Sequence, residues 1–259
     1  RERLLFMNCI KSFAGAALLT LVAGTAQAQN LAITELCDAT LTGGQPKWVE
    51  LTNVGTTTIP DLSVFSIGNF NNGSMTLGFD ATPLNAVSLA PGQSYVFAYE
   101  SAANTACDPM ALVTCFEYVY GFPADQYAGS FTNGDDAIAL FNGVPPAAGA
   151  AGTAYPDPAI FDVYGTPGCD PNSAGSTCPE WEYTDGYSVR CVPGPAATFN
   201  AADWILPGPD TLEPDATCDN LCKAQTLTDP GNFAGCGTPT TGFCTAKTGL
   251  SCGSRRSCR

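Results

Sequence analysis

The chain has 259 residues, no histidine, and a net charge of −14 at pH 7. So negative a surface repels the phosphates of nucleic acids and of anionic membranes, and we expect neither as a partner. The lack of histidine excludes Ser-His-Asp and Cys-His nucleophile systems within this chain, and histidine-ligated metals. With 27 glycines and 20 prolines, the composition favours short strands and turns over long helices.

Residues 7–28 have the pattern of a secretory signal peptide. Lys11 precedes an apolar run, and a small-x-small cleavage site ends at Ala28. The run is shorter than the roughly 20 residues of a membrane-spanning helix, so a membrane anchor is the weaker alternative. We expect residues 1–28 to be removed, those before Met7 being upstream sequence. The rest would be secreted or displayed on the cell surface, with no stable membrane insertion.

Cysteine usage points to the same compartment. Thirteen cysteines are present, twelve of them after the expected leader, and an even number in an exported chain favours disulfides. A zinc site is the weaker alternative, because only Cys218 and Cys222 have a suitable short spacing. The sequence leaves the connectivity open, although a disulfide between Cys169 and Cys178 would close the polar loop that they bracket.

Short runs of alternating apolar and polar residues predict an all-β domain. The first two, at residues 31–38 and 48–52, are typical of half-buried strands. Asn-Gly pairs flank the run at residues 137–141, which is a hairpin signal. Further strand candidates lie at residues 61–67, 86–89, 94–99, 115–120 and 159–164, and aromatic segments lie at residues 181–191 and 199–205.

The composition changes after Ile205. Residues 206–217 are rich in proline and acidic residues, which predicts a linker. Residues 218–259 contain six cysteines and few large apolar groups, so they predict an irregular segment that depends on disulfides. Its end looks like the start of another secreted module and closes on basic residues, which indicates a truncated or frameshifted terminus.

Six motifs follow one another along the body of the chain. They are I-T-E-L at 33–36, W-V-E-L-T-N at 48–53, L-A-P-G-Q-S-Y-V-F at 89–97, N-G-D-D-A-I-A-L-F at 133–141, F-D-V-Y-G at 161–165 and Y-S-V-R at 187–190. Each is common by itself, but the ordered set resembles the lamin-tail domain family in its bacterial extracellular form. The resemblance implies an immunoglobulin-like β-sandwich over residues 29–205 and a role in binding or anchoring, sometimes beside hydrolases. It does not cover residues 207–259.

Two glutamates are the only candidates for a catalytic pair. Glu35 and Glu50 lie on adjacent expected strands, where a glycosidase-like arrangement is conceivable. The alternation places both opposite the apolar positions, on the solvent face. They also belong to the lamin-tail framework, for which the resemblance implies no catalysis. We therefore expect no catalytic residue and no enzyme activity, and a carboxylate-only hydrolase is the weakest alternative.

Three aspartates are the best candidates for a calcium site. Asp135 and Asp136 lie in a Gly-Asp-Asp turn that supplies two carboxylates, and Asp162 on the next strand could approach them. The spacing is not that of an EF-hand loop. The preferred interpretation is therefore a turn shaped by Asx-type hydrogen bonds, with no cofactor.

The remaining conspicuous side chains are aromatic or basic. Trp48, Trp181 and Trp204 could form a sugar-stacking platform, although packing in the core or over a sheet is the preferred interpretation. Arg190 is one of very few cations, and we expect it to pair with a nearby carboxylate.

Together these features predict a non-enzymatic secreted or cell-surface module for interaction or anchoring. Its partner would be an extracellular protein or glycan that the sequence does not identify. Recognition is expected in the loops at residues 69–73, 145–154 and 169–178. The alternative is a calcium- or carbohydrate-binding accessory domain of a longer secreted hydrolase.

Overall fold

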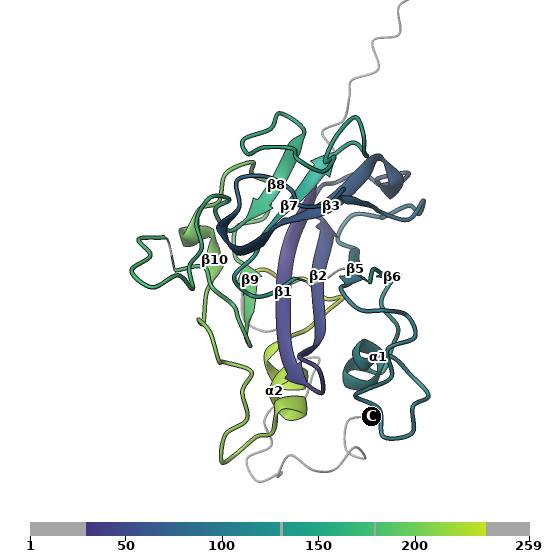
Figure 1. The fold of residues 1–259 in the computed structure, drawn as a ribbon. Helices are drawn as coiled ribbons and strands as arrows, with labels where there is room; N and C mark the ends of the chain where they lie inside the picture. Colours follow the sequence, from purple (N-terminus) through teal and green to yellow (C-terminus); the bar gives the residue numbers. More distant parts are fainter. Residues whose placement is uncertain (1–29, 130–131, 179, 237–259) are drawn as a thin grey trace, which may run out of the picture.

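The computed structural model describes residues 30–129, 132–178 and 180–236 of the chain. These residues form an all-β sandwich of two sheets with few helices, which confirms the fold class (Figure 1). The expected signal peptide and the last part of the Cys-rich segment lie outside the described residues.

The two sheets differ in size. The first contains, in order across the sheet, β10 (Trp204–Ile205), β9 (Tyr187–Arg190), β1 (Leu31–Leu41), β2 (Gln45–Asn53), β5 (Ser94–Ala98) and β6 (Gln126–Tyr127). The second contains β4 (Thr82–Pro83), β3 (Phe65–Phe70), β7 (Ala137–Asn142) and β8 (Ile160–Tyr164). Helices α1 (Cys115–Tyr120) and α2 (Asn220–Leu227) and three 3-10 turns, Leu62–Val64, Asn71–Gly73 and Ala201–Asp203, complete the described elements. Paired strands are antiparallel, except for β5 and β6.

The main core lies between the sheets. Inward-facing residues of β1 and β2, such as Ile33, Leu36 and Val49, pack with residues of β3 and β7, such as Phe65 and Phe141. All five are essentially inaccessible to solvent. Burial of this many large apolar side chains is the main source of stability in such a sandwich.

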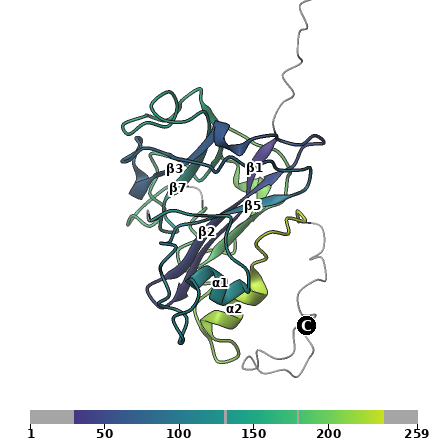
Figure 2. The same cartoon turned by 90° about the vertical axis from the view of Figure 1, so that its right-hand side faces the viewer.

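A second core covers the outer face of the first sheet. Trp48 and Cys37 on that face pack with Phe116 of α1, with Ala224 of α2 and with Leu212. Figure 2 shows α1 and α2 next to each other against one end of the sheet. The central strands β1 and β2 are therefore buried on both faces.

The strand expected at residues 115–120 is wrong, because these residues form α1. Thr114 caps the helix by accepting a hydrogen bond from the Glu117 N–H, and Gly121 ends it in the left-handed conformation, with φ of 82°. A Thr three residues before a Glu is the sequence signature of a capping box. The aromatic and β-branched residues at 115–120 favour a strand, so the composition predicted a strand where the capping residues begin a helix. The strand expected at residues 86–89 is also wrong, because the structure forms only an isolated bridge between Ile59 and Leu89 there.

The boundary expected after Ile205 is not a boundary in the structure. Leu212, inside the expected linker, is fully buried, and α2 lies against β1. A disulfide joins Cys191, beside β9, to Cys236. Residues 206–236 therefore complete the domain that begins at β1, because they cover a face of its sheet.

Four disulfides are formed in the described part of the chain. They join Cys107 to Cys115, Cys169 to Cys178, Cys191 to Cys236 and Cys218 to Cys222. The second closes the polar loop that its two cysteines bracket, and the last leaves no thiolate pair for zinc. Cys37 is a free, buried cysteine. This density of disulfides is compatible with an extracellular protein. In the ranges given above, no helix is long and apolar enough to cross a membrane.

Candidate functional site

Glu35 and Glu50 do not lie on a solvent face, so that prediction is wrong. They are direct cross-strand partners on β1 and β2, and they are 5% and 0% exposed. The alternation correctly placed them opposite the main core, but residues 206–236 and α1 cover that face. A shift of register between Ile33 and Glu35 marks a β-bulge in β1. Because of it, Thr34 also reaches the outer face and contacts Glu50.

Each carboxyl group is held by neighbours within the fold. Thr34 Oγ1 donates to Glu50 Oε1 at 2.6 Å, and the Gly231 N–H donates to Glu50 Oε2 at 2.6 Å. The Asp229 N–H donates to Glu35 Oε1 at 3.3 Å. Burial raises the pKa of Glu35 well above its ordinary value, and the Glu50 charge raises it further. Burial also raises the pKa of Glu50, although the bonds from Thr34 and Gly231 oppose this. A closed pair of this kind gives a substrate no access.

The three calcium candidates have separate roles. Asp136 accepts hydrogen bonds from the N–H groups of Asn72 and Asn133, so it shapes the turn before β7. Asp162 forms a buried ion pair with Arg190, whose Nη2 lies 2.7 Å from Asp162 Oδ1. This confirms that Arg190 pairs with a carboxylate. Among the described residues, no group of three or more Asp, Glu, Cys or His side chains could hold a metal ion.

Of the three calcium candidates, Asp135 is the one that has a buried carboxylate oxygen, Oδ1, without a hydrogen-bond partner among the described residues. Since the oxygens of Asp136 and Asp162 are already engaged, we expect calcium at millimolar concentration to leave the melting temperature unchanged within about 1 °C, because only ligands that bind the native state raise it. Calorimetry of residues 29–259 with calcium and with chelator checks this. A larger rise would mean that Asp135 recruits further ligands.

The three tryptophans do not form a sugar-stacking platform. Trp48 and Trp181 are fully buried, and Trp204 is nearly so. Trp48 donates to the Tyr120 hydroxyl at 3.0 Å, and Arg190 lies 4.6 Å from the centre of the Trp204 ring. Their packing in the core, which the sequence analysis preferred, is confirmed. No aromatic face of these residues is left for a carbohydrate to stack on.

An exposed loop closed by a disulfide is absent from the predictions made from the sequence. The stapled loop, residues 107–115, starts at Cys107 and returns to Cys115 at the start of α1. Its apolar tip, Met110-Ala111-Leu112, points outward: Met110 is 68% and Leu112 is 73% exposed. Ala111 has a φ of 51°, which turns the chain back at the tip.

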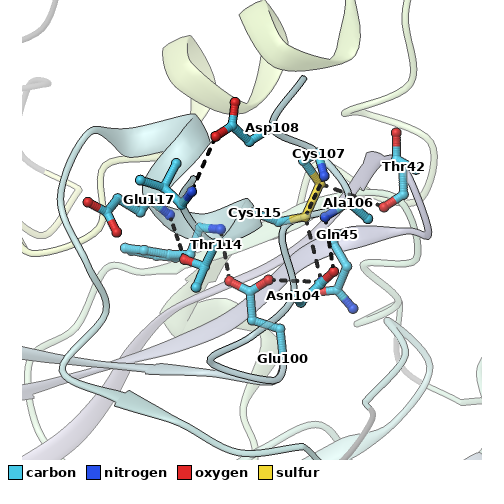
Figure 3. Close-up of a disulfide and its surroundings, with 12 residues drawn as sticks. Thr42, Gln45, Glu100, Asn104, Ala106, Cys107, Asp108, Thr114, Cys115 and Glu117 are labelled. Carbon is cyan, nitrogen blue, oxygen red and sulfur yellow. Dashed lines mark hydrogen bonds between the residues drawn. A yellow bond between two sulfur atoms is a disulfide. The ribbon is translucent and has the colours of Figure 1, made fainter. Parts of the chain in front are cut away.

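Asp108 holds the stapled loop in shape from inside. Its carboxylate accepts hydrogen bonds from the N–H groups of Met110 at 3.0 Å, Leu112 at 2.8 Å and Val113 at 3.2 Å. At the base, buried Glu100 accepts a hydrogen bond from the Phe116 N–H at 2.8 Å. Figure 3 shows Glu100 and Asn104 beside the Cys107–Cys115 disulfide. The tip is therefore exposed and fixed in conformation at the same time.

The loop at residues 169–178 begins with the same three residues as the stapled loop. Both loops open with Cys-Asp-Pro and close with a cysteine eight or nine residues after the first. Asp170 accepts from the Asn172 N–H at 3.0 Å, as Asp108 does from Met110. This repeated pattern could have identified the stapled loop from sequence. The second loop carries only polar and small residues at its tip, so it offers no comparable apolar contact.

Comparison with protein-family models, curated proteins and solved structures finds no significant match to the chain. The resemblance to the lamin-tail domain therefore stays a prediction.

Proposed function

We propose that the chain is a non-enzymatic interaction module, secreted or displayed on the cell surface, that binds an extracellular protein through the apolar tip of the stapled loop. The observation that carries this proposal is that the side chains of Met110 and Leu112 are exposed to solvent on a turn of fixed shape. The turn is fixed by a disulfide and by three backbone N–H groups that donate to the Asp108 carboxylate. A single exposed leucine is ordinary on a protein surface. Two large apolar side chains on one rigid turn are better suited to contact a partner.

The rigidity of the stapled loop favours a high affinity, because a flexible loop would have to be ordered on binding, and that ordering costs free energy. A loop that already has its bound shape avoids most of this cost. The side chains of Met110 and Leu112 make apolar contacts, which fit a pocket on a protein. A glycan would instead require an aromatic platform with convergent polar groups, and Trp48, Trp181 and Trp204 are all buried. The negative charge of the chain disfavours nucleic acid.

Two further points support an extracellular binding role. The four disulfides suit an oxidising compartment, in agreement with the expected leader. The resemblance to the lamin-tail domain implies binding or anchoring. The buried glutamate pair supports the absence of catalysis, because neither carboxylate is open to a substrate.

The test compares a double variant with a matched control. Labelled residues 29–259 are titrated onto intact cells of the producing organism and onto its concentrated culture medium. We expect saturable binding, weakened at least about tenfold in Met110→Ser/Leu112→Ser, because anchor residues at an interface contribute 1 kcal/mol or more each. Phe79→Ser, which removes an 81% exposed side chain from another loop, should bind like the wild type.

All of these substitutions are at exposed positions, so melting temperatures should not change and cannot account for lost binding. Equal binding by the double variant, or no saturable binding of the wild type to either preparation, would contradict the proposal.

A further inference from the structure

The last described residues form a segment without helix or strand that crosses the outer face of the first sheet. We call residues 228–236 the strap. It begins at the end of α2 and ends at Cys236, which a disulfide joins to Cys191. The Asp229 and Gly231 N–H groups bind the side chains of Glu35 and Glu50, respectively. Closure of the strap thus depends directly on two buried carboxyl groups.

No cation balances these carboxyl groups. The described residues include three cations, Lys47, Arg190 and Lys223, and each is paired with a different aspartate. The titratable groups that face Glu35 and Glu50 are a third carboxylate, Asp229, and three weakly acidic groups: Cys37, Tyr120 and Tyr187. Two ionised glutamates would therefore repel each other in a region that water does not reach.

The pair can still exchange protons with solvent. Thr34 Oγ1 contacts Glu50 Oε1 at 2.6 Å and Thr52 Oγ1 at 2.8 Å. Thr52 Oγ1 contacts Ser94 Oγ at 2.8 Å, and Ser94 is partly exposed. This chain of hydroxyl groups connects the buried pair to the surface while the strap is closed. The protonation of the pair can therefore follow the external pH without prior opening.

We propose that the strap is a pH-dependent closure: a proton held by the Glu35–Glu50 pair keeps it shut, and loss of that proton opens it. Opening would be local, since the strap has no secondary structure of its own and stays tethered through Cys236. It would uncover the polar strip of β1 and β2, next to a surface hollow of about 240 Å³ that is lined in part by Thr52 and by Phe233 of the strap.

The direction of the effect follows from the carboxyl groups. The Asp229 and Gly231 N–H groups of the strap favour the ionised carboxylates and lower the pKa values of Glu35 and Glu50, respectively, but burial under the strap outweighs them. Both pKa values are therefore raised above the ordinary glutamate value of 4.5, so the closed state holds a proton that the opened state releases. The stabilising effect is complete below that ordinary value. It is lost as the pH rises through the raised pKa values, so the strap should open on the alkaline side.

Hydrogen exchange of residues 29–259, read by mass spectrometry at several pH values, tests the proposal. After correction for the intrinsic exchange rate, we expect protection of residues 228–236 to fall at least about tenfold from about pH 5 to about pH 8, since one pKa unit corresponds to a factor of ten. A peptide covering β2 should keep its protection, which separates local opening from global unfolding.

The double variant Glu35→Gln/Glu50→Gln removes both ionisable groups and should make strap protection independent of pH within about threefold. Glu50→Gln alone leaves the buried Glu35 but removes the repulsion between the two charges, so it should lessen the fall, and it serves as the test if the double variant does not fold. Glu213→Gln, at an exposed position, should behave like the wild type. Constant protection in the wild type, or an unchanged fall in either glutamine variant, would overturn the proposal.

Discussion

Replacement of Asp162 by alanine is expected to lower the free energy of unfolding by about 3–5 kcal/mol, because it leaves a buried, uncompensated arginine. Asp162 on β8 and Arg190 on β9 are both buried. Arg190 Nη2 reaches both carboxylate oxygens of Asp162, at 2.7 and 2.9 Å. The Ile33 N–H donates to Asp162 at 2.7 Å, and Arg190 Nε donates to the Ile33 carbonyl at 2.7 Å. The pair therefore joins the edge strand of one sheet to β1 and β9 of the other.

Urea denaturation of Asp162→Ala, Arg190→Ala and the double variant measures this interaction. The double variant should cost clearly less than the sum of the single variants, since it leaves no charge unpaired. Lys223→Ala, which removes the more exposed ion pair with Asp215, serves as the control and should change stability little. If Asp162→Ala costs no more than Lys223→Ala, the ion pair does not hold the sheets together.

Much of the sandwich could be predicted from short apolar and alternating runs. Strands expected at residues 31–38, 48–52, 94–99, 137–141 and 159–164 correspond to β1, β2, β5, β7 and β8. The first two alternate apolar and polar residues with the period of a strand, whereas residues 137–141 are a continuous apolar run flanked by Asn-Gly pairs. The disulfide between Cys169 and Cys178 closes the short polar loop that these two cysteines bracket, although the sequence left the connectivity open.

The segments that cover the outer face of the first sheet could not be predicted from the residue pattern of its strands. Alternation assigns Glu35 and Glu50 to one face, but it does not say that a segment almost 200 residues away lies over them. Residues 206–236 contain few large apolar groups, and Leu212, one of four leucines among them, lies in no periodic run that would signal its burial. The short helix α1 was hidden because its aromatic residues favour strands, whereas its capping residues, Thr114 and Glu117, decide the local structure.

The apolar tip of the stapled loop was missed for a related reason. Met110 and Leu112 are not part of any periodic run, and exposure of an apolar side chain has no signature in sequence. Their position depends on the three hydrogen bonds of Asp108 and on the pairing of Cys107 with Cys115, and the sequence had left that pairing open.

Truncation after Ile205 is expected to have the second large effect. It removes Leu212, whose burial contributes about 1.5–3 kcal/mol, and the Cys191–Cys236 disulfide, which contributes about 2–5 kcal/mol. It also exposes Cys37 and the apolar surface that α2 covers. For a domain of this size each kcal/mol shifts the melting temperature by about 2–4 °C. We therefore expect residues 29–205 to melt at least about 10 °C below residues 29–236, or to show no cooperative transition.

Residues 206–236 cover the outer face of the first sheet, enclose the Glu35–Glu50 pair and include the strap, so all three features require that these residues are an integral part of the β-sandwich. Thermal unfolding of three chains tests this requirement most directly: residues 29–236, the same residues with Cys191→Ser and Cys236→Ser, and residues 29–205 with Cys191→Ser. We expect residues 29–205 to be much less stable than residues 29–236 without the disulfide, because packing of Leu212 and α2 contributes beyond the cross-link. Equal melting temperatures for those two chains would show that residues 206–236 are an appendage, and would contradict the account.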